Sequence, residues 1–197
     1  YYAAADCTGH GVPGAMVSVV CHEALNRALR EFKLRKPSSI LNKVRELVID
    51  TFERGGQGDV KDGMDISLCV LNSKTKELRW AGANNPLWIL RKGADSFEEI
   101  KADKQPIGKY EDPKPFTEHV VQLNTDDITY IFTDGYQDQF GGPRGKKYKA
   151  RQLKETILSI SERPMPQQIK FLNEKFEEWR GDLEQLDDVC VIGVRMT

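Results

Sequence analysis

Hydrophobic residues follow two different periods along the chain, one typical of helices and one typical of strands. From Met16 onward they recur three or four positions apart, which predicts a helix from about Pro13 to about Leu34 with one buried face that includes Phe32. A second stripe of this kind runs from Ile40 to Phe52, and we expect a serine just after Pro37, Ser38 or Ser39, to cap that helix. A helix pair is therefore predicted near the start of the chain.

The middle of the chain changes to short strand-like runs separated by Asn, Gly, Pro and Asp, residues that are frequent in turns. Two more helices are predicted near Arg151 to Ser161 and Pro166 to Arg180, followed by a last strand from Val189 to Val194. The six central runs are Met64 to Leu71, Glu77 to Ala83, Leu87 to Arg91, Phe97 to Lys101, Phe116 to Leu123 and Ile128 to Thr133. The core positions predicted for the last helix are Ile169, Leu172, Phe176 and Trp179.

This order of elements predicts the fold class. Helices occur in pairs beside strands that follow one another, so the chain does not alternate strand and helix. Such an order is typical of an α+β domain in which antiparallel sheet is covered by helices. With 197 residues, of which 39% are hydrophobic and 30% charged, we expect one compact domain over residues 1–197.

Charge and hydropathy exclude several classes of partner. The 29 Lys and Arg residues against 30 Asp and Glu give a net charge of −1, so no overall field attracts nucleic acid or an anionic membrane. The sequence contains no apolar run of membrane-spanning length and no signal-peptide pattern. We expect a cytoplasmic domain with a small or local substrate, without nucleic-acid or membrane contact.

The four cysteines lack the C-x-x-C spacing of closed zinc sites and of redox motifs. They occur in apolar or helical contexts, which favours reduced, buried thiols. A zinc site built from Cys7, Cys21 and His22 is a minor alternative.

Three carboxylate-bearing turns come where strand-like runs stop. Asp6 lies in A-D-C-T-G-H-G, Asp134 in I-F-T-D-G, and Asp187 and Asp188 in Q-L-D-D-V. Mg²⁺ and Mn²⁺ prefer carboxylate, carbonyl and water oxygens, and neighbouring carboxylates repel one another without a cation. The pattern indicates metal-assisted hydrolysis. On spacing alone, Asp6 and Asp134 are explained equally well as turn residues.

The segment Gly9 to Ala15 has the spacing G-x-G-x-x-G/A of a dinucleotide-binding turn. Against that function, the helix is followed by another helix instead of a second strand, and Asp6 would place a negative charge near the pyrophosphate. The alternative is that the glycines turn the chain sharply enough to aim Asp6 and the Cys7 carbonyl into one pocket.

Five motifs, in order, give the chain a resemblance to a known family over almost its whole length: D-C-T-G-H-G-V-P-G-A, A-G-A-N-N-P-L, Q-P-I-G, I-F-T-D-G-Y-Q-D and D-D-V-C-V-I-G-V. The chain resembles the bacterial metal-dependent serine/threonine protein phosphatases of the PPM superfamily, in the SpoIIE/RsbU-like group. The resemblance implies an antiparallel β-sandwich flanked on both sides by helix pairs (αββα). It also implies hydrolysis of phosphoserine or phosphothreonine on a bacterial signalling protein by a water that two metal ions activate.

The resemblance also assigns residues. It implies that Asp6 is shared by two Mn²⁺ or Mg²⁺ ions and that Cys7 contributes its backbone carbonyl. It implies that Asp134 and Asp187 are further ligands and that they act with Asp6 as catalytic groups. Asp188 is expected alongside, either supporting a ligand or substituting for one. Because adjacent strand residues face opposite ways, only one of Asp187 and Asp188 is expected to enter the pocket.

Two more residues are candidates for the pocket. His10 is a candidate because imidazole in general titrates near neutrality, but the family's histidine follows the bridging aspartate more closely, at the position of Thr8. We therefore expect His10 to be a structural residue of the turn, with proton transfer as the alternative. Asp65, in D-G-M-D-I-S, is either an extra pocket acid or a strand-edge carboxylate.

A basic segment follows the Asp134 turn. This segment runs from Gly141 to Arg151 and has no acidic residue. Its basic residues are Arg144, Lys146, Lys147, Lys149 and Arg151. A solvated loop is the ordinary explanation. The functional alternative is a flap in which cations such as Arg144, Lys146 and Lys147 bind a phosphorylated protein segment.

The chain departs from the family pattern at its start. Relatives carry a further strand with Gly-Asp ahead of the first motif, whereas this chain begins at Tyr1 without a methionine. We expect an N-terminally truncated domain that binds metal weakly or with one ion, from a more active parent. The resemblance also implies an upstream sensory or signalling region and a phosphorylated anti-sigma-antagonist-like substrate.

Two other functions stay open. One is a catalytically impaired phosphatase-like module that regulates or binds a partner. The other is a hydrolase of small phosphoesters.

Overall fold

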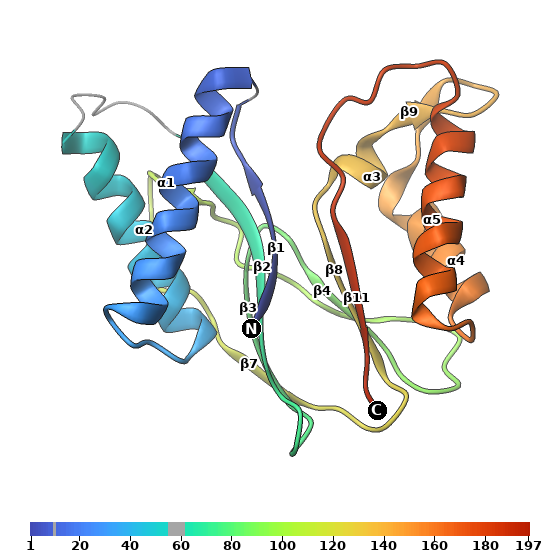
Figure 1. Cartoon of the computed structure of the whole chain (residues 1–197), viewed down its shortest axis with the longest axis horizontal. Coiled ribbons are helices and arrows are strands. Elements are labelled where there is room, and N and C mark those ends of the chain that lie inside the picture. Colours follow the sequence, from blue (N-terminus) through green and yellow to red (C-terminus); the bar gives the residue numbers. More distant parts are fainter. Residues whose placement is uncertain (10, 55–61) are drawn as a thin grey trace. The chain divides into compact units, whose positions relative to one another are not determined.

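The computed structural model describes residues 1–9, 11–54 and 62–197 and divides into two compact units. The first comprises Tyr1–Leu87 and Ile100–Leu123, and the second Trp88–Glu99 and Asn124–Thr197. Each unit contains an antiparallel sheet and a helix pair (Figure 1). The mixed α+β class is confirmed, and the single domain stays a prediction. None of the described helices has the length and hydropathy needed to cross a membrane.

The first unit is a sheet with the strand order β1-β2-β3-β7, with β6 beside β2, and with helices α1 and α2 packed on it. Since β1 and β2 are antiparallel and α1 is followed by α2, this is not the parallel arrangement of a dinucleotide-binding fold. The elements are β1 Tyr2–Cys7, α1 Gly11–Arg30, α2 Pro37–Arg54, β2 Gly63–Asn72, β3 Glu77–Ala83, β6 Ile107–Gly108 and β7 His119–Gln122.

The ends of the first helix pair differ from the prediction. Helix α1 ends at Arg30, so Phe32 lies beyond it and is exposed rather than part of the buried stripe. Helix α2 begins at Pro37, whose fixed φ suits a first helical position. Ser38 is therefore inside the first turn, where its hydroxyl donates to Glu118 instead of capping the helix.

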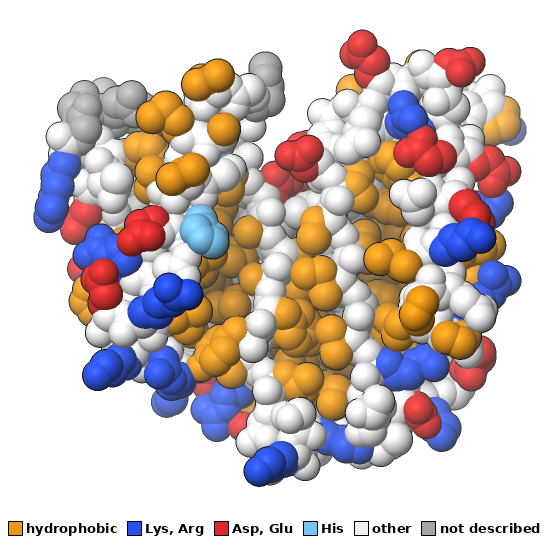
Figure 2. Space-filling model, viewed as in Figure 1, with side chains coloured by type: hydrophobic (Ala, Val, Ile, Leu, Met, Phe, Trp, Pro, Cys, Tyr) orange, Lys and Arg blue, Asp and Glu red, His pale blue; other side chains and the backbone are white. Residues whose placement is uncertain are grey.

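Helix α1 also carries a second hydrophobic stripe that points to solvent. Val12, Met16 and Val19 are 75%, 67% and 68% exposed, although their spacing is that of one helix face. Figure 2 shows hydrophobic side chains gathered over this helix. Periodicity identifies an apolar face but not what covers it, so hydropathy alone does not separate this stripe from the buried one.

The second unit is a sheet with the strand order β11-β8-β4-β5, packed against helices α4 and α5. The three short elements α3, β9 and β10 follow β8 and were not predicted, because two to four residues are too few to show a period. The elements are β4 Leu87–Leu90, β5 Glu98–Ile100, β8 Ile128–Phe132, α3 Gly135–Asp138, β9 Phe140–Gly141, β10 Lys146–Lys147, α4 Lys149–Ile160, α5 Met165–Arg180 and β11 Val191–Arg195.

One predicted core position of α5 is wrong. Leu172 and Phe176 are buried as predicted, but Ile169 is 66% exposed. Gln168 takes the buried position, because its amide oxygen accepts a hydrogen bond from the buried Tyr130 hydroxyl at 2.7 Å. A polar residue is stable there once its hydrogen bonds are made, and its polarity hid it from the hydrophobic pattern.

The turn before β8 is organised by the buried carboxylate of Asp127, whose side chain is 2% exposed. It accepts hydrogen bonds from the backbone N–H groups of Asn124 and Lys92 and from the Arg91 guanidinium, at 2.9, 3.0 and 2.8 Å. Burial acts to raise the pKa of Asp127, but these hydrogen bonds outweigh it and lower the pKa below its ordinary value.

We expect Asp127→Asn to lower the free energy of unfolding by about 3 kcal/mol at pH 7, because it removes the charge that pairs with Arg91. Since the folded-state pKa lies below the unfolded value, the wild-type advantage is present above about pH 4 and is lost as the pH falls through the folded pKa. Urea unfolding at pH 7 and pH 3 measures both effects. The exposed Asp95→Asn is the control, and an equal loss in both variants would contradict this role.

Candidate metal centre

Asp134 lies at the junction of a buried strand and a short helix. Strand β8 is buried throughout and ends at Phe132, and α3 begins at Gly135. Asp134 occupies the N-cap position of α3, but its side chain makes no capping hydrogen bond to that helix. A capping hydrogen bond therefore does not explain an aspartate at this position.

The segment that carries Asp187 and Asp188 is held beside this junction by Thr133. The Thr133 hydroxyl donates to the Asp188 carbonyl and accepts from the Cys190 N–H, both at 3.0 Å. The Thr133 N–H donates to the Cys190 carbonyl at the same distance. These three bonds fix the segment to the end of β8.

Close approach of the two segments requires glycine at position 135. A Cβ atom added there would lie 2.4 Å from the Asp188 carbonyl oxygen and 3.3 Å from that of Asp187. Side-chain carbon atoms do not come this close to a carbonyl oxygen. The sequence Asp134-Gly135 therefore places a carboxylate where the segment of Asp187 and Asp188, which precedes β11, can pass at van der Waals distance.

The result within the second unit is a pair of carboxylates. Oxygen atoms of Asp134 and Asp187 lie within 4.8 Å of one another. Asp187 also accepts a hydrogen bond from the Asp188 N–H at 2.8 Å, which orients it. For Asp188 the described contacts involve its backbone, through Thr133 and Gly135, whereas the carboxylate of Asp187 belongs to the pair.

Asp6 and Cys7 end strand β1 in the first unit. The next residue, Thr8, ties this end to the start of β2: its hydroxyl donates to Asp62 and accepts from the Gly63 N–H, both at 3.0 Å. Gly9 follows with a φ of +85°, and a Cβ at Gly14 would lie 2.5 Å from the Gly9 carbonyl oxygen. Gly9 and Gly14 thus allow a close approach just after β1, and the aiming of Asp6 and the Cys7 carbonyl into one pocket stays a prediction. His10 lies outside the described residues.

The Cys7 thiol contacts Ser18 and Cys21 of α1. A hydrogen bond with Cys21 lowers the pKa of Cys7 to about 6, while burial acts to raise it and a hydrogen bond with Ser18 lowers it further. The same contact and burial raise the pKa of Cys21. All four cysteines are without a disulfide, and among the described residues Cys7, Cys21 and His22 do not form a metal-binding group.

The basic segment forms the short hairpin of β9 and β10 and the start of α4. Two of its cations are paired: Lys147 with Asp138 at 2.7 Å and Arg151 with Glu155 at 2.9 Å. Arg144, Lys146 and Lys149 are exposed, and no ion pair is found for them among the described residues; Lys149 belongs to α4, and the other two lie on the hairpin. Arg144 and Lys146 are the cations of this hairpin that remain available to an external anion.

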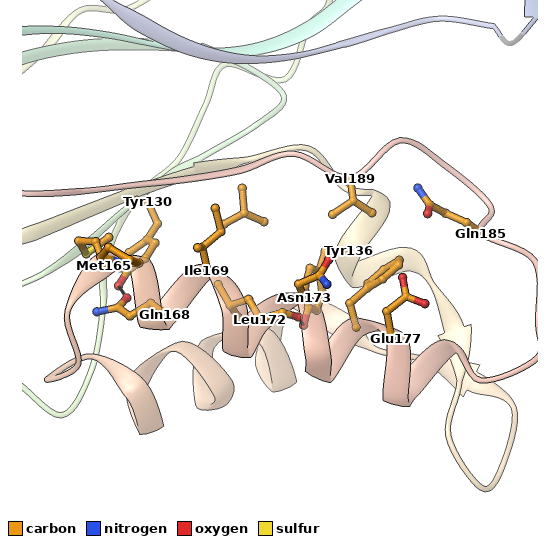
Figure 3. A pocket seen from close by; sticks show the side chains of 14 residues that line it. Tyr130, Tyr136, Met165, Gln168, Ile169, Leu172, Asn173, Glu177, Gln185 and Val189 are labelled. Carbon is orange, nitrogen blue, oxygen red and sulfur yellow. Dashed lines mark hydrogen bonds between the residues drawn. The ribbon is translucent and has the colours of Figure 1, made fainter.

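The second unit also contains a cavity of about 700 Å³ between α5 and the strands β8 and β11 (Figure 3). Its walls are mainly apolar, and burial raises the pKa of the Tyr130 hydroxyl at one side of it to about 12. The exposed Ile169 is one of its lining residues. The described lining contains none of the predicted ligands, although Tyr136, Gln185 and Val189 lie within two residues of Asp134 or Asp187 in sequence.

Comparison with solved structures identifies the fold. The chain matches the SiaA-PP2C domain of Pseudomonas aeruginosa with a TM-score of 0.86 and 25% identity, over 99% of this chain and 75% of that one. It matches the RsbU and RsbW domains of Rv1364c from Mycobacterium tuberculosis with a TM-score of 0.72 and 21% identity, over 98% and 50%. RsbX in complex with magnesium matches with a TM-score of 0.62 and 14% identity, over 99% and 80%. The last two show the fold alone.

These matches define the chain as a PP2C-type phosphatase domain. No curated protein sequence matches it. The family model of stage II sporulation protein E (SpoIIE) matches residues 2–197, and the chain belongs to that family.

Proposed function

We propose that the chain is a metal-dependent protein serine/threonine phosphatase that removes phosphate from a bacterial signalling protein. The observation that carries the proposal is the carboxylate pair of Asp134 and Asp187, within 4.8 Å, in a member of the SpoIIE family. Two carboxylates this close repel unless a cation lies between them or a proton is bound. All-oxygen donors suit Mg²⁺ and Mn²⁺.

The residues that hold the metal are proposed from the resemblance and from this geometry. Asp134 and Asp187 are proposed as ligands from the geometry of the second unit, and Asp6 with the Cys7 carbonyl are proposed as ligands from the resemblance alone. Asp188 supports the pair through its backbone. RsbX, a protein of the same fold, is described with magnesium, which supports a divalent cation here. The intact parent is proposed to hold two ions.

The chemistry follows from these charges. Divalent ions lower the pKa of a bound water and neutralise phosphoryl oxygens, so hydrolysis needs no covalent phosphoenzyme. The protein's own part is to hold its carboxylates in place before substrate binds. Thr133 and Gly135 do this by fixing the two segments of the second unit. A site held in this way loses little free energy to reorganisation during the reaction.

The proposed substrate is a phosphorylated anti-sigma-antagonist-like protein, and the proposed parent has an upstream sensory or signalling region in the bacterial cytoplasm. The joint occurrence of RsbU and RsbW domains in one related chain supports a signalling role. Phosphate release from a phosphoserine or phosphothreonine protein, measured with Mn²⁺ and with EDTA, tests the function. A regulatory module releases none under either condition, and a small-molecule hydrolase prefers aryl phosphates.

The basic hairpin is proposed to bind the phosphoprotein. We expect simultaneous replacement of Arg144 and Lys146 by glutamine to raise the KM for a phosphoprotein about tenfold while leaving that for a small aryl phosphate unchanged, because only the larger substrate reaches these exposed cations. Steady-state kinetics on both substrates measures this. Replacement of the paired Arg151 by glutamine is the control. An equal change for both substrates would remove the hairpin from substrate binding.

A further inference from the structure

Asp65 lies directly across the sheet from Asp6. Strands β1 and β2 are antiparallel, and their register pairs Asp6 with Asp65, one step before the pair of Cys7 and Met64. Side chains of directly opposed residues lie on the same face of a sheet, with Cβ atoms about 4.5–5.5 Å apart. The two carboxylates therefore start from neighbouring positions.

The face on which they lie is the one that α1 and α2 do not cover. Met64, Ile66 and Leu68 belong to the hydrophobic core beneath these helices, and Ala3 and Cys7 pack against the same core. Because strand residues alternate between faces, Asp6 and Asp65 point to the opposite side. Neither carboxylate is part of the helix-covered core.

Asn84 sets the direction of the Asp65 carboxylate. Its side-chain amide donates to Asp65 Oδ1 at 2.8 Å. The Asn84 backbone is left-handed, with a φ of +59°, and its N–H donates to the Asp103 carbonyl at 3.0 Å. Asparagine tolerates this backbone conformation better than most residues, but it has a cost. A residue held in this way is a fixed donor for Asp65.

Two carboxylates in this arrangement favour a cation. Like charges directly opposed on a sheet destabilise it, and a neutral pair at these positions would avoid that cost. A divalent cation accepts carboxylate oxygens at about 2.0–2.6 Å, so one ion can contact side chains whose Cβ atoms are cross-strand neighbours. Asp6 is already a proposed ligand on independent grounds, since it lies in the first of the family motifs.

We propose that Asp65 contributes a carboxylate oxygen to the coordination shell of the cation held by Asp6, and that Asn84 is the positioning residue for Asp65. The inference rests on the proposed function, because it assumes a cation at Asp6. It adds an acid that none of the five sequence motifs contains. It also explains why the strained position 84 carries an asparagine rather than a glycine.

Direct Mn²⁺ binding to the whole chain, measured by electron paramagnetic resonance of free Mn²⁺ and by calorimetry, tests the inference. We expect Asp65→Asn to raise the apparent Kd for Mn²⁺ by about 10- to 100-fold and Asn84→Gly by a smaller factor. Glycine keeps the left-handed backbone of position 84 and removes only the donor. Asp112→Asn, an exposed acid of the same unit, controls for the loss of one negative charge.

The outcomes separate this inference from the function on which it rests. If the wild type binds Mn²⁺ and Asp6→Asn does not, a cation site at Asp6 stands; unchanged binding in Asp65→Asn and Asn84→Gly would then overturn the role of Asp65 alone. If the wild type binds no Mn²⁺, the proposed function fails first. If Asp65→Asn does not fold, Asn84→Gly is the deciding variant. A lowered melting temperature with an unchanged Kd for Mn²⁺ in Asn84→Gly would mean that these residues stabilise the fold and do not bind the cation.

Discussion

Replacing Asp134 with alanine is expected to reduce Mn²⁺-dependent phosphate release from a phosphoprotein by a factor of about 10³ or more. A bound divalent cation contributes several kcal/mol of transition-state stabilisation, and each 1.4 kcal/mol is a factor of about ten in rate. Losing one of the two carboxylates of the second unit removes much of that contribution. The measurement is kcat with saturating Mn²⁺, compared with the wild type.

Thermal stability gives the same variant a second, independent signature. Without metal, removing Asp134 relieves its repulsion with Asp187, so the melting temperature is expected to stay constant or to rise. With Mn²⁺, the wild type gains stability by mass action and the variant does not. Asp138→Asn is the matched control, because Asp138 lies in the adjacent helix α3 and forms an exposed ion pair with Lys147. A variant that keeps both its turnover and its Mn²⁺-dependent stabilisation would show that Asp134 is only a turn residue.

The fold was largely predictable because its main elements are long and amphipathic. Strand β3 has the predicted bounds, Glu77 to Ala83, and both helix pairs occur in the predicted order. The errors come from contacts that a local period does not report. Gln168 replaces Ile169 in the core because a tyrosine hydroxyl in a distant strand satisfies its amide. Phe32 is exposed because the helix ends at Arg30.

The candidate site was predictable in its charged residues and not in the residues that hold them. Asp134 and Asp187 were identified by their motifs, and the structure brings their carboxylates together within one unit. Thr133 was missed as a supporting residue, since its partner Asp188 lies 55 positions away in sequence. Asn84 lies in the motif A-G-A-N-N-P-L, but its partner Asp65, 19 positions away, was not foreseen. A hydroxyl or an amide in a turn has many local explanations, so only the tertiary contacts reveal its function.

Gly135 offers the most direct test of how the pair is held. We expect Gly135→Ala to lower the free energy of unfolding by about 1–3 kcal/mol, because its Cβ would lie 2.4 Å from the Asp188 carbonyl oxygen and one segment must move. The same displacement separates Asp134 from Asp187. A misplacement of about 1 Å in a preorganised site costs on the order of 10² in rate, so kcat is expected to fall by that factor while both carboxylates remain present.

Comparing Gly135→Ala with Asp134→Ala distinguishes the position of the carboxylate from its charge, since Asp134→Ala removes a proposed ligand and Gly135→Ala only moves it. Raising the Mn²⁺ concentration is therefore expected to restore part of the activity of Gly135→Ala and none of that of Asp134→Ala. Gly93→Ala is the control in the same unit: its φ of +72° strains an alanine by about 1 kcal/mol, but nothing lies within 4 Å of the added Cβ. Equal stability and equal kcat in Gly135→Ala and Gly93→Ala would contradict this role. The segment of Asp188 would then move away from the added Cβ without loss of stability, and glycine at position 135 would not be what brings the two carboxylates together.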